Sequence, residues 1–327
     1  MQYRPLGQSG IQASAVAFGG GPIGGGPWGE VDENQAIAAI RSVIDEGINL
    51  IDTAPVYGFG TSEELIGKAI AGRRQQVFIA TKCGLVWHVA KGEPFHKTFC
   101  GKSVNRYLGP ESIRYEIEQS LRRLGTDYVD LYQTHWQDST TRIADTMETL
   151  LDLKREGKIR AIGVSNCSIE QLKQYRDVGP VDCAQEKYNM LDRRLEWDRA
   201  PFCAQNNIAV LAYTPLANGL LTGKVWARRE FPDDDLRRDN PQFAPEMRTQ
   251  VRQMLEEMWP VAARHGLTFS QLAIAWTLGQ KGITHALVGV RNERQALENA
   301  KAGSVVLSGP ELTVLAEVLA KYEMTSN

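Results

Sequence analysis

Eight short apolar segments recur along the chain, and each is followed by at least one segment with helical spacing. Apolar runs bounded by turn residues are typical of buried strands, and apolar residues three and four positions apart are typical of amphipathic helices. The expected strands are 15–18, 48–52, 77–82, 128–134, 159–164, 181–184, 208–212 and 285–290. Strand–helix alternation predicts a parallel sheet, and eight repeats predict an α/β fold of the closed (β/α)8 TIM barrel type. An open, doubly wound sheet is the competing fold.

No break in composition divides the 327 residues, so we expect one barrel domain over 1–327. Residues 2–14 resemble an N-terminal β-hairpin, and long loops at 84–109 and 214–245 are expected at the C-terminal rim. Helices are expected after Asp32 and after Ser168, which have Gln35 and Gln171 in capping positions. Further helices are expected from Thr61 and over or near 111–124, 142–156, 195–206, 246–264, 268–280, 292–302 and 310–322.

Charge and cysteine usage exclude several classes of protein. The formal net charge of −2 gives no electrostatic reason to expect nucleic acid or an anionic membrane as partner. The first residues lack the apolar stretch of a signal peptide, and no run of about eighteen apolar residues occurs. The five cysteines form no C-x-x-C pair and do not cluster with histidine. These features predict a cytoplasmic protein with reduced thiols and no metal site.

Hydrogen-bonding side chains stand where the expected strands end. Asp52 taken alone is typical of a helix cap, but lysine and tyrosine are not caps, and the pattern returns at strand after strand. Catalytic groups of a (β/α)8 barrel lie on this rim. The polar residues at or just after strand ends are Asp52, Tyr57, Lys82, Thr134, His135, Ser165, Asn166, Gln185, Tyr213 and Arg291.

Four of these side chains make a coherent proton-transfer group. A tyrosine hydroxyl has an ordinary pKa of about 10, and a neighbouring ammonium lowers that pKa. We therefore expect Lys82 to tune Tyr57, and Asp52 to hold Lys82 in place. His135 is expected to hydrogen-bond a carbonyl oxygen and orient it. Such a group protonates a carbonyl oxygen while hydride reaches the carbon from a nicotinamide.

The chain resembles the aldo-keto reductases over essentially its whole length. The matching stretches are Asn49–Tyr57, Ala80–Cys83, Leu124–Tyr132, Gly157–Asn166 and Tyr213–Lys224. Within that family the sequence is most similar to the bacterial branch of sugar-cluster and inositol-cluster reductases. The resemblance implies a barrel that binds NADP(H) without a Rossmann domain, with Tyr57 as general acid–base. Gly19–Gly24 formally contains G-x-G-x-x-G, but no helix is expected at its third glycine.

The same resemblance assigns residues to the cofactor. Ser165, Asn166 and Gln185 would hold the carboxamide, and Tyr213 would stack on the nicotinamide ring. The segment 215–224 would follow the pyrophosphate, with Pro215, Leu216, Asn218, Gly219 and Lys224 in contact. The adenosine end would meet Gly289, Arg291, Gln295 and Asn299.

The adenosine end departs from the family pattern at two positions. Many relatives have lysine where Gly289 stands and arginine where Gln295 stands, and both bind the 2′-phosphate. Arg291 alone can supply that charge, because a guanidinium matches phosphate geometry. NADP(H) is therefore the preferred cofactor, and NAD(H) remains an alternative.

Three tryptophans follow strand ends and are candidates for the wall of the substrate pocket: Trp28, Trp87 and Trp136. Ordinary packing is the competing interpretation. The expected reaction is reduction of a small aldehyde or ketone, such as a short polar or sugar-derived carbonyl, to the alcohol. Two alternatives stay open: a nicotinamide-binding, redox-sensing module like a channel β subunit, and a dehydrogenase working in the oxidative direction. The sequence does not determine the oligomeric state.

Overall fold

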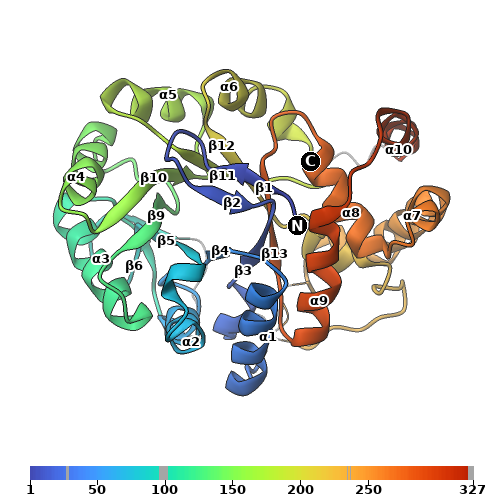
Figure 1. Ribbon diagram of the computed structural model, residues 1–327, viewed down its shortest axis with the longest axis horizontal. Coiled ribbons are helices and arrows are strands. Elements are labelled where there is room, and N and C mark those ends of the chain that lie inside the picture. The colour runs from blue at the N-terminus through green and yellow to red at the C-terminus, as the bar shows by residue number, and fades with distance from the viewer. Residues whose placement is uncertain (27–28, 96–101, 234, 236, 323–327) are drawn as a thin grey trace.

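The computed structural model describes residues 1–26, 29–95, 102–233, 235 and 237–322. Its centre is a closed barrel of parallel strands in the order β10-β11-β12-β13-β3-β4-β5-β9 (Figure 1). The barrel strands are β3 (Val16–Gly19), β4 (Leu50–Asp52), β5 (Phe78–Cys83), β9 (Val129–Thr134), β10 (Ile159–Ser165), β11 (Cys183–Lys187), β12 (Ala209–Tyr213) and β13 (His285–Gly289). The predicted closed (β/α)8 barrel is confirmed, and the competing prediction of an open, doubly wound sheet is wrong.

Helices surround the barrel on its outside (Figure 1). They are α1 (Glu33–Asp45), α2 (Thr61–Ile70), α3 (Pro110–Leu124), α4 (Ile143–Arg155), α5 (Ile169–Val178), α6 (Arg199–Gln205), α7 (Pro245–Arg264), α8 (Phe269–Gly279), α9 (Glu293–Lys301) and α10 (Gly309–Lys321). The side chain of Asp32 accepts a hydrogen bond from the backbone N–H of Gln35 at the start of α1. Ser168 and Gln171 form a complete capping box on α5. Both predicted helix starts are therefore confirmed.

The apolar core has two layers. The outer layer lies between the strands and the helices, and it holds, for example, Ile40 and Val43 of α1. The inner layer fills the barrel with alternating small and large side chains, such as Ala17, Leu50, Ala80, Leu131 and Ala161. The barrel is thus a packed core and not a pore.

A β-hairpin of β1 (Tyr3–Pro5) and β2 (Gln12–Ser14) closes one end of the barrel (Figure 1). Its Leu6 and Ile11 belong to the inner core layer. Its polar contacts go to residues that precede strands: the guanidinium of Arg4 donates to the carbonyl oxygen of Thr284, and Asn49 accepts from the backbone N–H of Ser14. The hairpin therefore covers the N-terminal end, and the C-terminal rim is left for the site.

The rim carries two long loops, as predicted. The loop after β5 was expected to be irregular, but it contains a small antiparallel sheet of β6 (Leu85–Val86), β8 (Asn105–Arg106) and β7 (Glu93–Pro94). Strands of two residues are too short to show a periodic pattern, which explains the error. The loop after β12 contains the 3-10 turn η5 (Ala217–Thr222).

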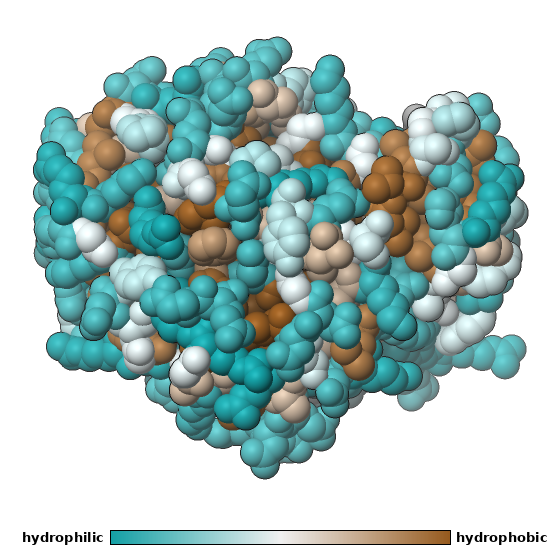
Figure 2. Space-filling view, in the orientation of Figure 1, coloured by the Kyte–Doolittle hydropathy of each residue, from teal (hydrophilic) through white to brown (hydrophobic). Residues whose placement is uncertain are grey.

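The face in the view of Figure 2 is mostly hydrophilic, and apolar side chains gather towards α7, α8 and α10. Of the helices in the described part of the chain, none is both long enough and apolar enough to cross a membrane.

Candidate active site

A buried ion pair stands at the C-terminal ends of β4 and β5. Asp52 is the last residue of β4, and Lys82 lies near the end of β5. The ammonium Nζ of Lys82 is 2.7 Å from Asp52 Oδ1 and 2.8 Å from the carbonyl oxygen of Thr53. Burial alone would lower the pKa of Lys82, but the Asp52 carboxylate opposes this and the pKa is raised. Lys82 is therefore an ammonium at neutral pH, although its side chain is fully buried.

Tyr57 lies above this pair. Its hydroxyl is 3.5 Å from Lys82 Nζ, which is the long limit of a hydrogen bond. The backbone of the glycine-rich loop packs against it: a Cβ added at Gly24 would lie 2.6 Å from the carbonyl carbon of Tyr57. These glycines therefore allow a close approach to Tyr57. The first α-helix after β3 begins only at Glu33, so the G-x-G-x-x-G match does not open a helix.

The Lys82 ammonium lowers the pKa of Tyr57, as expected, but the net shift is in the opposite direction. Burial raises the pKa of Tyr57, and this outweighs the lowering by the Lys82 ammonium. The reason is that burial removes the water that would stabilise a phenolate, and the attraction of the Lys82 ammonium at 3.5 Å does not fully replace that stabilisation. The phenol is consequently protonated at neutral pH and available as a proton donor.

His135 follows β9 and faces Tyr57. The two rings are in edge contact, with centroids 5.8 Å apart. Burial lowers the pKa of His135 well below its ordinary value, and the Lys82 ammonium lowers it further. The imidazole is therefore neutral and can hydrogen-bond a carbonyl oxygen without adding charge.

The four residues expected at the carboxamide end lie together beside this group. Asn166 donates from Nδ2 to the carbonyl oxygen of His135 at 2.9 Å, and Tyr213 donates its hydroxyl to Asn166 Oδ1 at 2.7 Å. Ser165 donates to the backbone carbonyl of Gln185, whose side chain donates to Asp52 Oδ2. One hydrogen-bonded network thus joins the expected cofactor contacts to the ion pair.

The loop after β12 has an unusual backbone. Thr214, Ala217, Asn218 and Gly219 all have positive φ. The hydroxyl Oγ1 of Thr214 is buried and has no hydrogen-bond partner among the described residues. Turns of this kind present backbone N–H groups to anions, and the orphaned hydroxyl is a further free donor. These residues fit a pyrophosphate. Pro215 and Leu216 lie within this loop, between Thr214 and η5.

The residues expected at the adenosine end lie on β13, α9 and the turn between them. Gly289 has no room for a side chain, because an added Cβ would be 2.9 Å from Cγ of Pro22. Gln295 is engaged locally: its Oε1 accepts from the backbone N–H of Arg291. Arg291 is exposed, and no carboxylate in the described ranges pairs with its guanidinium. Lys224, two residues after η5 in the loop that follows β12, pairs with Glu298 of α9 at 3.2 Å.

Asn299 of α9 is buried, with 5% of its surface exposed. Asn299 follows Glu298 in α9. Because Glu298 pairs with Lys224, the loop after β12 lies beside this helix. Arg291 has no ion-pair partner in the described part of the chain, and it lies in the turn between β13 and α9.

An apolar cluster lies beside Tyr57. Trp87 and Trp136 both belong to it, together with Phe59 and Phe95. The rings of Trp87 and Phe59 meet edge to face at 4.9 Å. Both tryptophans are thus near the expected reacting atoms, as a substrate wall requires. Trp28, the third candidate, lies outside the described residues.

Sequence reasoning missed Gln133, an inward residue of β9. It is fully buried and donates to Asp52 Oδ2 at 3.3 Å. Its signal was a polar amide at an interior position of an otherwise apolar strand, two residues before His135.

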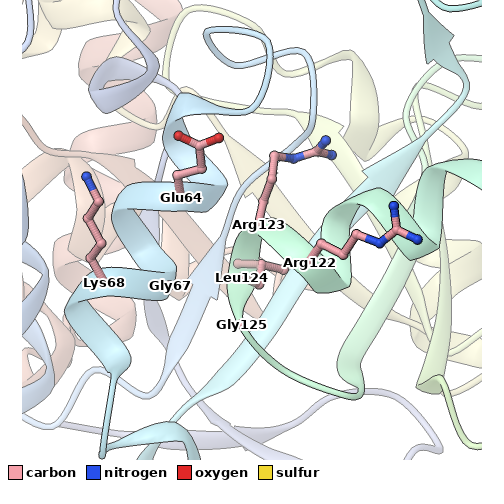
Figure 3. A pocket seen from close by; sticks show the side chains of 7 residues that line it. All are labelled: Glu64, Gly67, Lys68, Arg122, Arg123, Leu124 and Gly125. Atoms are coloured by element: carbon pink, nitrogen blue, oxygen red, sulfur yellow. The ribbon is translucent and has the colours of Figure 1, made fainter.

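Two surface hollows lie outside this network. The larger, about 360 Å³, is between α2 and α3 and is lined by Glu64, Gly67, Lys68, Arg122, Arg123, Leu124 and Gly125 (Figure 3). It contains none of the candidate catalytic residues. A second hollow of about 170 Å³ reaches Trp87 from the side of α3. Within the described ranges, no three histidine, cysteine or carboxylate side chains are arranged to hold a metal ion.

The chain is similar in sequence and in structure to known proteins of one family. Residues 15–320 match the model of the aldo/keto reductase family. The chain is 41% identical over 329 residues to an NADH-specific methylglyoxal reductase of Escherichia coli (strain K12), covering 99% of this chain and 100% of the relative. The structure of a glycerol dehydrogenase, AKR11B4, from Gluconobacter oxydans superposes with a TM-score of 0.88 at 37% identity, covering 98% and 95% of the two chains. An aldo/keto reductase from Klebsiella pneumoniae in complex with NADP and acetate superposes with a TM-score of 0.73 at 28% identity, covering 100% and 98%.

Proposed function

Because the chain belongs to the aldo/keto reductase family, we propose that it reduces a small aldehyde or ketone to the alcohol, with Tyr57 as the proton donor. The observation that carries this proposal is the buried Asp52–Lys82 pair beneath Tyr57, with neutral His135 facing the same phenol. We further propose that residues 1–327 form one domain. A cytoplasmic location agrees with the four described cysteines, which are free and buried.

In this mechanism the nicotinamide supplies hydride from C4 to the carbonyl carbon when the dinucleotide is bound. His135 hydrogen-bonds the carbonyl oxygen and orients it towards Tyr57. The Tyr57 hydroxyl gives its proton to that oxygen, and the electron pair of the broken O–H bond stays on the phenolate. Lys82 lies 3.5 Å away and stabilises the phenolate as it forms. Asp52 keeps the ammonium charged and in position.

For the cofactor, two observations point in different directions. Among the described residues no carboxylate pairs with the guanidinium of Arg291, so this group can meet a 2′-phosphate. Gly289 and Gln295 bring no charge, and Gln295 is engaged in a cap. The Escherichia coli relative is named as NADH-specific, and the Klebsiella pneumoniae structure contains NADP. We propose that NADP(H) is preferred through the single contact with Arg291, and that NAD(H) is also accepted.

For the substrate, we propose a short polar or sugar-derived carbonyl such as methylglyoxal, consistent with a role in sugar metabolism. The support is the name of the Escherichia coli relative, together with the aromatic cluster beside Tyr57 that contains Trp87 and Trp136. Two cations in the loop after β5, Lys91 and Arg106, form ion pairs with Glu111 and Glu93. Oxidation of a polyol is the second candidate, because the Gluconobacter oxydans structure is that of a glycerol dehydrogenase. A proton donor buried beside a neutral histidine favours an enzyme over a redox-sensing binding module.

The test is loss of reduced-nicotinamide absorbance with a panel of small aldehydes, ketones and sugars, using NADPH and NADH in parallel. Tyr57→Phe is expected to lower kcat by on the order of 10²-fold or more, because the transferable proton is gone. Nucleotide binding, followed by fluorescence titration, should change little. Tyr3→Phe is the matched control, since Tyr3 lies exposed on the hairpin at the opposite end of the barrel. Full activity of Tyr57→Phe would refute the role of Tyr57.

A further inference from the structure

The two carboxylate oxygens of Asp52 have different partners. Oδ1 faces the Lys82 ammonium at 2.7 Å. Oδ2 accepts from two side-chain amides, Gln185 Nε2 at 2.8 Å and Gln133 Nε2 at 3.3 Å. All four side chains are buried. Since hydrogen bonds to a charged acceptor are the stronger ones, these amides hold the carboxylate in one rotation.

Gln133 also fixes the orientation of the Gln185 amide. Its Oε1 accepts from Gln185 Nε2 at 3.3 Å and from the thiol of Cys183 at 3.6 Å. Both N–H groups of Gln185 Nε2 are therefore used, one by Asp52 and one by Gln133. The amide of Gln185 consequently turns its nitrogen towards the ion pair, and its own carbonyl oxygen is left to accept a further donor.

The barrel makes space for this arrangement. Gln133 pairs with Lys82 of β5 on one side and with Gly163 of β10 on the other. A Cβ added at Gly163 would lie 2.7 Å from Cγ of Gln133. Glycine at 163 therefore lets the Gln133 side chain cross the barrel to Asp52.

We propose that Gln133 is a positioning residue for the reductase reaction, which holds Asp52 against Lys82 and orients Gln185 so that its side-chain carbonyl oxygen is left as an acceptor that would be available to the carboxamide of a bound nicotinamide. This inference rests on the proposed function. Gln133 itself touches neither substrate nor cofactor in this arrangement, and it acts through Asp52 and Gln185. Without it, Asp52 Oδ2 keeps only the Gln185 amide as a donor, and that amide loses the acceptor that fixes its orientation. The carboxylate is then held less firmly against Lys82, and Lys82 holds its proton less strongly.

The first test is Gln133→Met, which keeps the approximate volume and removes both hydrogen-bonding groups. We expect kcat to fall about tenfold or more, while KM for the carbonyl stays within about threefold. The alkaline limb of the kcat–pH profile should move to lower pH, because Lys82 loses its proton earlier. Gln280→Met is the matched control: its amide donates to the carbonyl oxygen of Trp276 at the end of α8, which precedes β13 and so lies away from the rim.

The second test is Gln133→Glu, which keeps the shape of the side chain. A carboxyl group at 133 donates to Asp52 only when it is protonated, so kcat should recover as the pH is lowered. A purely structural role for Gln133 predicts that the melting temperature recovers in parallel with kcat, whereas a positioning role predicts a folded variant whose kcat alone depends on pH. Thermal melting and circular dichroism of each variant separate loss of folding from loss of positioning.

The outcomes of these tests are distinct. Wild-type turnover that Tyr57→Phe abolishes supports the proposed function. If Gln133→Met and Gln133→Glu then both keep the wild-type kcat and pH profile, the positioning role is overturned and the proposed function stands. Absence of wild-type turnover with every carbonyl and both nucleotides overturns the proposed function and, with it, the role of Gln133.

Discussion

The ion pair of Asp52 and Lys82 should behave as a unit when its members are replaced singly and together. Lys82→Met leaves the Asp52 carboxylate buried without a counter-ion, which costs about 3–5 kcal/mol of stability. Asp52→Asn is expected to cost a similar amount for a different reason. One face of the new amide meets the Lys82 ammonium and the other meets two amide donors. A single carboxamide oxygen cannot accept from both sides.

The double variant Asp52→Asn with Lys82→Met removes both conflicts. The oxygen of the new amide then accepts from Gln133 and Gln185, and the amide nitrogen turns towards the carbonyl oxygen of Thr53, which Lys82 vacates. We expect a cost of about 0–2 kcal/mol for the double variant, and so a coupling energy of about 4 kcal/mol or more between the two sites.

The assay is urea unfolding at pH 7, followed by the fluorescence of the seven tryptophans. With an m-value of about 3 kcal/mol per molar urea, each single variant should lose on the order of 1 M in its midpoint. The coupling should survive about 1 M NaCl, because the pair is buried and salt screens it little. Single costs that simply add in the double variant would contradict the reasoning, as would a cost below about 1 kcal/mol for Lys82→Met.

Two further variants test charge elsewhere in the molecule. Burial raises the pKa of Glu116 from 4.5 to about 8, so the folded protein binds this proton more strongly than the unfolded chain, and stability is lost as the pH rises from about 4.5 to about 8. Glu116→Gln keeps an acceptor for Gly84 N–H and a partner for Ser112. It should therefore be more stable than the wild type by on the order of 3–5 kcal/mol at about pH 8 and nearly equal at about pH 4.5 by thermal melting, whereas a constant difference across this range would refute the assignment. Arg291→Ala should weaken NADPH by about tenfold or more in fluorescence titrations and leave NADH nearly unchanged, with Arg294→Ala as the neighbouring control; equal weakening of both nucleotides would mean that Arg291 does not bind the 2′-phosphate.

The fold could be predicted from the sequence because its elements carry local signals. The apolar run before Asp52 and the capping pairs at Asp32 and Ser168 each depend on residues within a few positions of one another. The prediction erred where an element was too short to show a period, as in β7 at Glu93–Pro94. Periodicity is informative over a window of residues, and two residues provide none.

The candidate site was predictable to the extent that its residues end strands. Asp52, Lys82, Tyr57 and His135 lie together in the structure, and their chemical roles stay predictions. Gln133 was missed because its importance depends on partners far away in the chain: Gly163, which makes room for it, and Asp52, 81 positions away, which accepts its hydrogen bond. The pKa of Tyr57 was misjudged for a related reason, since the degree of burial is a property of the packed fold and not of local sequence.

The hairpin of β1 and β2 gives the molecule a barrel with one open end. Leu6 and Ile11 close the N-terminal end, and they pack against buried side chains of the inner layer such as Leu50 and Leu131. In the proposed mechanism, we therefore expect the proton that Tyr57 gives to a substrate to be replaced from the rim through which the alcohol leaves. Proton return and product release then share one opening, because the hairpin closes the other end of the barrel.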